Sequence, residues 1–515
     1  MAAVVDAPAS RYGPRTLRLI VMTASVLATG MTALDMTIGA VALPYMRGSL
    51  SATQDQVGWV LTSYIVATAI VMPASGWLAN RFGRKRVYIM AMVGFTVASV
   101  LCGLATSLNQ EVAFRALQGA FGGPLVPLSQ TIVLDTYPRK EHGRAIAIWG
   151  FGVVLGPVLG PTLGGYLTEA YGWPWIFFIN VPIGIVAISC AIAGLPSSAP
   201  RKSARLDRFG FLALAVAVAA VQTMLDRGER QDWFASNEIM IEAAVAALAF
   251  YLLIVHTITA KRSFINTELF ADRNFVIGTF LIFAFGFIML PPFALLPAFL
   301  QDLRGIPIST VGILLSPRSI GVMLGMLLSG RLLGRIDQRL LMITGLLLIA
   351  WGAWDMAGWN ASVGNHAVVV NGVVSGFGMG MLYSPLFTVS FATLKSELRV
   401  EGTGLFQLLR NVGSSVSIAV FLALFVRNTT IARASIVENV TPYNPAFGSS
   451  GLAGMWNLQT PAGLAAIELE ISRQAQMIAY VNDFYLLCFI ALAMIPLALL
   501  LRTRAGSEDE IIVDL

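Results

Sequence analysis

The stretch that decides the fold is GFGVVLGPVLGPTLGG, residues 150–165. Four of its glycines recur at every fourth position, namely Gly152, Gly156, Gly160 and Gly164. On a helix this spacing makes one face without side chains, which lets a second backbone approach closely, as in contacts between transmembrane helices. Pro157 and Pro161 lie beside this glycine stripe and each removes a backbone donor. We therefore expect a bent helix whose freed carbonyls are satisfied by neighbouring helices.

The composition is that of an integral membrane protein. Of the 515 residues, 56% are hydrophobic and 12% are charged, whereas soluble domains carry roughly 25% charged residues. The apolar runs are long enough to cross a bilayer as helices, and they lack the strict alternation of barrel strands. The net charge of +6 does not indicate nucleic-acid binding, because the positive residues lie in short loops between apolar runs.

Hydropathy predicts fourteen membrane spans. They cover residues 18–45, 57–79, 87–106, 112–135, 144–167, 174–195, 208–226, 238–260, 274–301, 310–333, 339–359, 366–393, 403–427 and 480–502. Lys and Arg gather in alternate loops, such as RFGRKR at 81–86 and YPRKEHGR at 137–144. The positive-inside rule places these loops and both termini in the cytoplasm. We expect a multi-pass protein of the cell membrane, the inner membrane where there are two.

An internal repeat divides the chain. VGWVL at 57–61 lies over VGILL at 311–315, and the same offset pairs Gly76 with Gly330, so the second span resembles the tenth. We therefore expect an N-terminal six-helix bundle and a C-terminal six-helix bundle with two inserted helices between them. Their predicted ranges are 1–195, 266–515 and 196–265, respectively. Residues 428–479 are expected to be a long extracytoplasmic loop with an amphipathic helix at 461–480.

Two buried charges carry the chemistry. LDMTIGAVALP at 34–44 places Asp35 inside the first span, where a carboxylate is costly and marks a functional site by default. Arg115 in the fourth span needs a partner, and Asp35 is the only acid expected deep in the N-terminal half. We therefore expect the two to pair, directly or through water. The alternative is that Arg115 snorkels to a membrane interface.

Several motifs, in the right order, resemble those of one family. The stripe resembles the antiporter motif in the fifth helix of drug:proton antiporters of the major facilitator superfamily, and LDMTIGAVALP resembles the first-helix motif of their fourteen-span branch. RALQG at 115–119 resembles the fourth-helix motif. GWLANRFGRKR at 76–86 resembles the loop motif between helices two and three, with Gly76, Asn80, Arg81, Gly83 and Arg84. The chain departs from the family pattern at Gly39, Ala40 and Asn80. The overall resemblance is to the EmrB/QacA subfamily, more to its EmrB side.

The resemblance implies an all-α integral membrane protein with the major facilitator fold, two six-helix bundles plus two additional helices. It also implies proton-coupled export of lipophilic small molecules by alternating access, with Asp35 and Arg115 as the proton-coupling pair. The stripe helix would form the seam between the two halves. The expected substrate cavity contains Gln118, Gln222, Asp226, Arg318, Arg410 and Asn411.

Two other functional classes remain open as alternatives. A proton symporter for uptake would share the fold, although the glycine-proline stripe argues against it. An enzyme or receptor is the third class, but we find no GxxxxGK[ST] motif, metal-ligand cluster or nucleophile–base pair in the sequence, so we expect no metal, no cofactor and no ATP hydrolysis.

The expected partners are a lipophilic substrate, protons and membrane lipids. The resemblance to exporters of tripartite assemblies adds a periplasmic adaptor protein and an outer-membrane channel, with the loop 428–479 as the docking segment. Because Arg318 and Arg410 outnumber acids in the expected cavity, we predict neutral or weakly acidic substrates.

Overall fold

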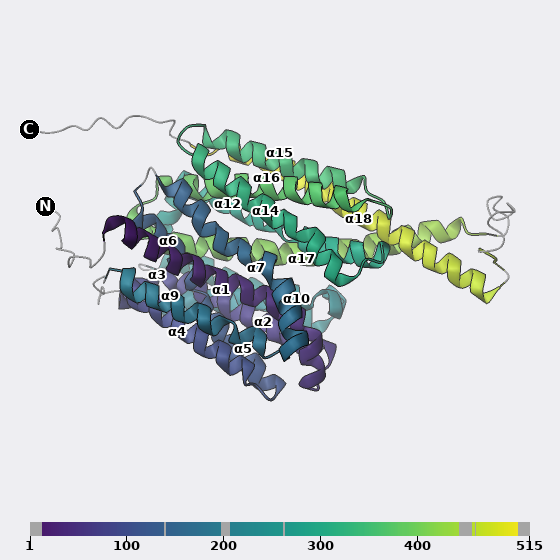
Figure 1. Ribbon diagram of the computed structural model, residues 1–515, viewed down its shortest axis with the longest axis horizontal. Coiled ribbons are helices and arrows are strands. Elements are labelled where there is room, and N and C mark those ends of the chain that lie inside the picture. Colours follow the sequence, from purple (N-terminus) through teal and green to yellow (C-terminus); the bar gives the residue numbers. More distant parts are fainter. Residues whose placement is uncertain are drawn as a thin grey trace, which may run out of the picture.

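The computed structural model describes residues 13–138, 141–196, 206–260, 263–441, 456–458 and 460–502. These residues form an elongated bundle of helices that run mostly along its long axis (Figure 1). The first nine helices are α1 (Pro14–Ser49), α2 (Gln54–Val71), α3 (Ser75–Phe82), α4 (Arg84–Gly103), α5 (Leu108–Gly122), α6 (Leu125–Thr136), α7 (His142–Tyr171), α8 (Trp175–Phe178) and α9 (Asn180–Gly194). The inserted pair is α10 (Arg208–Arg227) and α11 (Asn237–Thr259). The remaining helices are α12 (Arg273–Met289), α13 (Pro291–Ala298), α14 (Ile308–Leu332), α15 (Gln338–Ala357), α16 (Asn365–Ala392), α17 (Arg399–Glu438) and α18 (Pro461–Leu499).

Each predicted span coincides with one helix or with consecutive short helices. In the described ranges, twelve helical stretches are long and apolar enough to cross a membrane. The other two predicted spans are α5 with α6, which are separated at Gly123 and Pro124, and α7, a continuous helix of 30 residues. The prediction of an all-α, multi-pass membrane protein is confirmed.

Proline and glycine set the breaks inside and between spans. Pro73 lies in the single turn of 3₁₀-helix, η1 (Met72–Ala74), between α2 and α3, and Pro124 precedes α6. Both positions fit a residue that has no backbone donor. Gly83 joins α3 to α4 with a φ of 89°, a conformation that other residues rarely adopt. This requirement explains why the loop motif has glycine there.

The two interfaces between the predicted halves are related by the internal repeat. In the repeat the second span corresponds to the tenth, α14, and the fifth span, α7, corresponds to the thirteenth, α17. The structure packs α14 against α7, and α17 against η1 and α3 at the end of the second span. The fifth span of one half thus contacts the counterpart of the second span in the other half, at both interfaces. Two repeated halves related by an axis along the membrane normal would pack in this way. The inserted helix α10 packs on α11, α2 and α17.

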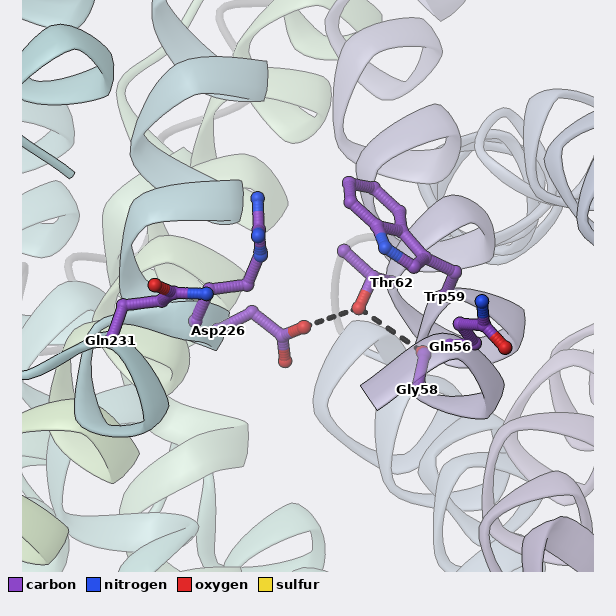
Figure 2. Close-up of a pocket in the computed structure, with 7 residues that line it drawn as sticks. Gln56, Gly58, Trp59, Thr62, Asp226 and Gln231 are labelled. Carbon is purple, nitrogen blue, oxygen red and sulfur yellow. Dashed lines mark hydrogen bonds between the residues drawn. The ribbon is translucent and has the colours of Figure 1, made fainter. Parts of the chain in front are cut away.

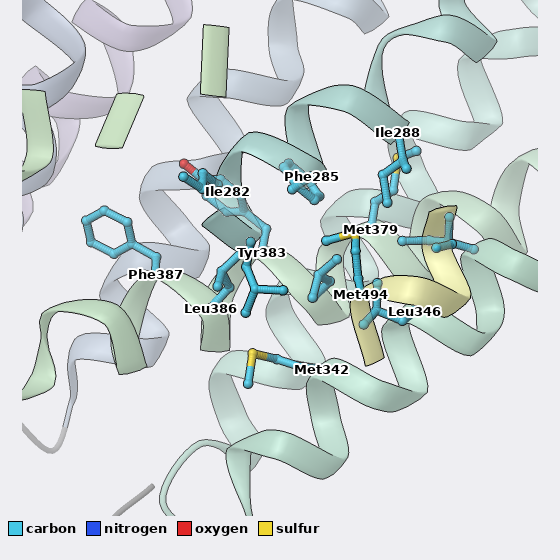
Figure 3. Packing of buried hydrophobic residues seen from close by; sticks show 14 of the residues in the cluster. Ile282, Phe285, Ile288, Met342, Leu346, Met379, Tyr383, Leu386, Phe387 and Met494 are labelled. Carbon is cyan, nitrogen blue, oxygen red and sulfur yellow. The ribbon is translucent and has the colours of Figure 1, made fainter. Parts of the chain in front are cut away.

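The C-terminal half has a core of large apolar side chains. Figure 3 shows side chains of α12, α15, α16 and α18 that pack against one another, including Phe285, Met342, Met379 and Met494. Methionine here fills the space between helices, as its flexible side chain suits. This packing fixes the helices that carry the C-terminal part of the candidate site.

The glycine stripe itself lies against α1, whereas α7, the helix that carries it, packs on α14 of the C-terminal half through another face and so takes part in the seam between the halves. A Cβ atom at Gly152 or Gly156 would overlap the carbonyl of Val26 or Ala33, and one at Gly160 would overlap the side chain of Thr37. All three contacts are with α1. The contact of α7 with the C-terminal half is made nearer its start, where Gly143 lies against Leu333 of the α14 C-cap. The glycine stripe therefore lets the backbones of α1 and α7, two helices of the N-terminal half, approach each other closely.

Much of the segment expected to be a loop is helix. The helix α17 continues to Glu438 and α18 begins at Pro461, so 428–438 and 461–479 extend two membrane helices. Figure 1 shows both helices projecting beyond the rest of the bundle. The helix predicted at 461–480 is present, but it is continuous with the last span. We call residues 428–438 and 461–479 the projecting hairpin.

Candidate functional site

Asp35, in the middle of α1, accepts hydrogen bonds from three side chains of two other helices. Arg115 Nη1 lies 2.6 Å from Oδ2, and Gln118 Nε2 lies 2.9 Å from Oδ1. Asn180 Nδ2, at the first position of α9, lies 3.0 Å from Oδ1. All four side chains are buried. We call them the Asp35 cluster, and they hold the carboxylate with the short, charge-assisted geometry expected of a strong interaction.

Arg115 is held by several contacts besides its bond to Asp35. Its Nη1 also donates to Gln118 Oε1 at 2.7 Å, and its Nε donates to the carbonyl of Val60 at 3.2 Å. Its guanidinium carbon lies 4.4 Å from the centroid of the Tyr64 ring and 5.5 Å from that of Phe177, within the range of a cation–π interaction. Arg115 has no exposed surface, so the snorkelling alternative is wrong. Asp35 and Arg115 pair directly.

The local sequence explains how Asn180 reaches this site. The helix α8 starts after Pro174 and ends at Phe178, and Ile179 separates it from Asn180, the first residue of α9. Asn180 therefore points from a helix start into the bundle, and its amide also donates to Ser99 Oγ at 3.0 Å. Ser99 in turn donates to the carbonyl of Phe177 at 2.9 Å. This chain of bonds fixes the orientation of the amide toward Asp35.

The loop motif lies where the two halves touch. A Cβ atom at Gly76 would be 3.0 Å from the backbone of Glu401, the third residue of α17. Arg84 forms an ion pair with Asp135, and Arg399 of α17 lies 4.0 Å from the same carboxylate. Asn80 is exposed and lines a cavity of about 370 Å³ together with Asp207, Glu401 and others. Arg81 lies in the last turn of α3. The motif therefore contacts α17 of the C-terminal half at this end of the molecule. We call this end, where RFGRKR at 81–86 lies, the basic end.

A second buried network joins the halves and was not predicted. Gln130 of α6 donates to the hydroxyl of Tyr383 of α16 at 3.2 Å. Gln407 of α17 donates to Gln130 Oε1 at 2.7 Å. All three side chains are buried. The network was not predicted because its members are neutral amides and a phenol, whereas the sequence analysis looked for charged residues inside the spans.

The residues expected to line one cavity are distributed over separate places. Gln118 belongs to the Asp35 cluster, and Gln222 of α10 donates to Ser415 Oγ of α17 at 2.9 Å. Figure 2 shows Asp226, one turn after Gln222 at the C-terminal end of α10, facing Thr62 of α2, which donates a hydrogen bond to its carboxylate. Asp226 and Thr62 line a pocket of about 250 Å³ with Trp59 and Gln231. This pocket lies between α2 and α10.

Arg318 and Arg410, the two arginines expected in the cavity, have no acidic partner in the described structure. Arg318 of α14 is buried, with its guanidinium carbon 5.4 Å from the centroid of the Phe293 ring. Its Nε has no hydrogen-bond partner among the described residues. Arg410 of α17 is half-buried, and its Nη2 donates to Asn411 Oδ1 at 3.4 Å. Positive charge therefore predominates at these two positions.

Comparison with known proteins identifies the family. The model of the Major Facilitator Superfamily matches residues 25–418. The chain belongs to the major facilitator superfamily. It is 32% identical over 498 residues to the multidrug export protein EmrB of Escherichia coli K12, covering 95% of this chain and 96% of that protein. It is 34% identical over 476 residues to EmrB of Haemophilus influenzae, covering 91% and 92%. It is also 34% identical over 423 residues to the fatty acid resistance protein FarB of Neisseria gonorrhoeae, covering 81% and 83%.

Solved structures confirm the superfamily fold. The human organic anion transporter MFSD10 superposes with a TM-score of 0.57 at 15% identity, covering 93% of this chain and all of that one. The proton:xylose symporter XylE superposes with a TM-score of 0.58 at 13% identity, covering 94% and 97%. At these identities the likeness concerns the fold alone. The predicted kinship with the EmrB-type branch is confirmed by the sequence relatives.

Sequence reasoning missed two buried acids of this superfamily member. Glu111, in the first turn of α5, has no exposed surface, although the predicted span began just after it. Asp483 of α18 is also buried, and its two carboxylate oxygens have no hydrogen-bond partner among the described residues. The spacing of Glu111 one turn before Arg115 is the signal that could have found it. Asn180 was missed because an amide in a span is not costly enough to stand out.

Proposed function

We propose that the protein exports lipophilic small molecules in exchange for protons by alternating access. The names of its relatives, multidrug export proteins and a fatty acid resistance protein, support export. The observation that carries the proposal is the buried Asp35 cluster, a carboxylate held by one arginine and two amides inside a membrane bundle. An ionisable residue in such a place is typical of a proton relay.

The cluster suggests how a proton would be coupled to a change of conformation. With Asp35 ionised, three donors are matched to one acceptor group, and the charge of Arg115 is neutralised. Protonation of Asp35 would break its buried ion pair with Arg115, a loss that costs about 3–5 kcal/mol in the present arrangement of side chains. The protonated state therefore favours a conformation in which water reaches Arg115. Substrate would favour the conformation in which Asp35 is ionised and paired with Arg115. The proton and the substrate would therefore oppose each other's binding.

The free arginines bear on the chemistry of the substrate. Arg318 and Arg410 have no acidic partner in the described structure, so a lipophilic cation would meet like charge there, whereas a weak acid would not. We therefore infer that neutral or weakly acidic lipophiles are the preferred substrates. The name of the FarB relative agrees with a weak acid.

Transport into inverted vesicles with an acidic lumen tests export and its substrate class. Three probes differ in charge: phenylnaphthylamine is neutral, naphthoic acid is a weak acid, and propidium is a dication. We expect the first two to accumulate and propidium to be excluded. Arg318→Leu should reduce accumulation of naphthoic acid more than that of phenylnaphthylamine. Arg331→Leu, an exposed arginine of the same helix, is the control. Accumulation of propidium alone would contradict this substrate class.

We further propose that the protein lies in the inner membrane with both termini in the cytoplasm, and that the projecting hairpin docks a periplasmic adaptor protein of a tripartite assembly. The hairpin extends past the bundle and exposes apolar side chains, among them Leu464 and Leu469, which are 48% and 73% exposed. Exposed apolar residues beyond the membrane favour a protein partner.

A double substitution on the hairpin separates docking from transport. Leu464→Glu with Leu469→Glu should reduce export from intact cells but leave accumulation in inverted vesicles unchanged, because an adaptor matters only in the intact envelope. Equal losses in cells and in vesicles would count against docking.

A further inference from the structure

Glu111 is a buried acid for which the proposed mechanism has no use. It lies in the first turn of α5 with no exposed surface. Both of its carboxylate oxygens are buried and have no hydrogen-bond partner in the described part of the chain. Arg115 follows one turn later on the same face of the helix, and its Nη2 is also buried without a partner. A carboxyl group and a guanidinium nitrogen are thus left unsatisfied on successive turns of one helix.

The charge balance around Arg115 indicates that one of the two nearby carboxyl groups, Asp35 or Glu111, holds a proton. We call this the resident proton. The surrounding titratable groups are Asp35 from α1, Tyr64 from α2, Cys102 from α4 and Arg115 from α5. Arg115 supplies one positive charge, and Asp35 already neutralises it. An ionised Glu111 would be a second, uncompensated negative charge in a dry environment, where a buried charge without a partner costs several kcal/mol. Only one of the two carboxyl groups can be ionised at a time beside a single arginine.

We propose that Glu111 is the second proton-carrying carboxyl of this site and that it alternates with Asp35 as the counter-ion of Arg115. This inference rests on the proposed function of proton-coupled transport. When Asp35 pairs with Arg115, Glu111 holds the proton. When an O–H bond forms on Asp35, the O–H bond of Glu111 breaks, and Arg115 turns its free Nη2 toward the new carboxylate. This transfer moves one proton from Glu111 to Asp35 and one ion pair from Asp35 to Glu111, so no charge is left unpaired during it. The cycle closes when Glu111 takes up a proton from outside and Asp35 releases its proton to the cytoplasm.

The position of Glu111 gives the exchange a direction. The helix α5 begins at the end opposite to the basic end, because α4 starts at Arg84 in the loop motif and runs away from it. Glu111 therefore lies between Arg115 and that opposite end, which is the outer end in the proposed orientation. A proton that enters from outside would meet Glu111 before Asp35.

Infrared spectroscopy tests the resident proton without reference to transport. We compare the purified protein with Glu111→Gln at neutral pH, where the substitution preserves shape and removes only the titratable group. The inference predicts that the variant lacks a carbonyl band of a protonated carboxyl group. Loss of a carboxylate band instead would show that Glu111 is ionised and would overturn the inference.

The pH profile of transport tests the alternation. In proteoliposomes that take up phenylnaphthylamine under an imposed gradient, Glu111→Gln should need a proton concentration about tenfold higher than wild type for half-maximal rate, because Arg115 then has no second counter-ion. Glu169→Gln, an exposed glutamate near the end of α7, is the control and should leave the profile unchanged. A wild-type profile in Glu111→Gln would overturn the inference. Absence of gradient-driven uptake in wild type would instead contradict the proposed function, and the infrared result would still decide where the proton resides.

Discussion

At the scale of single residues, the molecule places one carboxylate among donors that leave it little freedom. Asp35 is bonded to Arg115, Gln118 and Asn180, and Asn180 is oriented by Ser99. Hydrogen bonds to a charged group contribute about 1.5–3 kcal/mol each, so each amide stabilises the ionised form relative to the protonated one. Loss of any one donor should therefore weaken the hold on the carboxylate.

Removal of one amide should move the pH dependence of transport. Asn180→Ala takes one donor from Asp35, so protonation becomes easier and the half-maximal rate should occur at higher pH in the vesicle assay. Asn371→Ala is a matched control, because Asn371 is equally buried and donates to the carbonyl of Gly352 and to Asp355, but it lies in α16. An equal shift in both variants would mean that the effect is structural.

The sequence alone was sufficient to pair Asp35 with Arg115, because opposite charges inside a bilayer have few other choices. It was not sufficient for Asn180 or Glu111. Asn180 depends on the short break between α8 and α9, and Glu111 depends on where α5 begins. Helix ends are the least certain part of a prediction from hydropathy. Both residues were therefore assigned to no function.

At the scale of elements, the glycine stripe brings α7 onto α1, the helix that carries Asp35. Thr37 of α1 donates to the carbonyl of Gly156 at 2.9 Å, which is further evidence that the two helices are in direct contact there. The stripe itself was read correctly from its spacing as a close-packing face. The helix that packs against the stripe was not predicted correctly. The spacing of the glycines shows that another backbone approaches closely, but it does not show which helix that is.

Two glycines of α7 offer a direct comparison. Gly156→Ala puts a Cβ atom onto the carbonyl of Ala33, and overpacking of this kind costs about 1–3 kcal/mol. We expect a lower midpoint of thermal unfolding in detergent and reduced transport. Gly165→Ala meets nothing within 4 Å and should change stability by less than about 0.5 kcal/mol. Similar behaviour of the two variants would contradict the α1–α7 contact.

Asp207 ties the inserted helices to the rest of the chain. It caps α10 by accepting from the Gly210 N–H at 3.1 Å, and it accepts from His256 Nε2 at 2.8 Å and from the Phe264 N–H at 2.9 Å. Burial acts to raise the pKa of Asp207, but the bonds from Gly210, His256 and Phe264 outweigh it, and the pKa lies below its usual value.

The direction of this shift predicts how stability depends on pH. Since the folded pKa of Asp207 lies below the unfolded value, its contribution is complete above the unfolded value and is lost as pH falls through the folded one. Asp207→Asn should lower the midpoint of thermal unfolding at neutral pH by an amount equivalent to about 1–2 kcal/mol, and the difference from wild type should shrink in acid. Asp337→Asn, at the exposed N-cap of α15, should cost less. A gap that widens in acid would contradict the shift.

At the scale of the whole molecule, the halves meet at the basic end. Gly76 lies against Glu401, and Gln130 bonds with Tyr383 and Gln407 across the interface. Hydropathy was enough to predict where the spans lie, because each span is a long apolar stretch. The projecting hairpin was taken for a loop, since its outer turns are polar and hydropathy reports only where a helix is apolar.

Proton release on substrate binding tests the central claim, that Asp35 couples protons to transport. Phenylnaphthylamine is added to purified protein in weak buffer, and the pH change is followed while fluorescence reports binding. We expect wild type to release protons, Asp35→Asn to bind the probe with no release, and Asp35→Glu to keep part of the release. An Asp35→Asn variant that releases as many protons as wild type would contradict the account, and the coupling carboxylate would then be sought at Glu111 and Asp226.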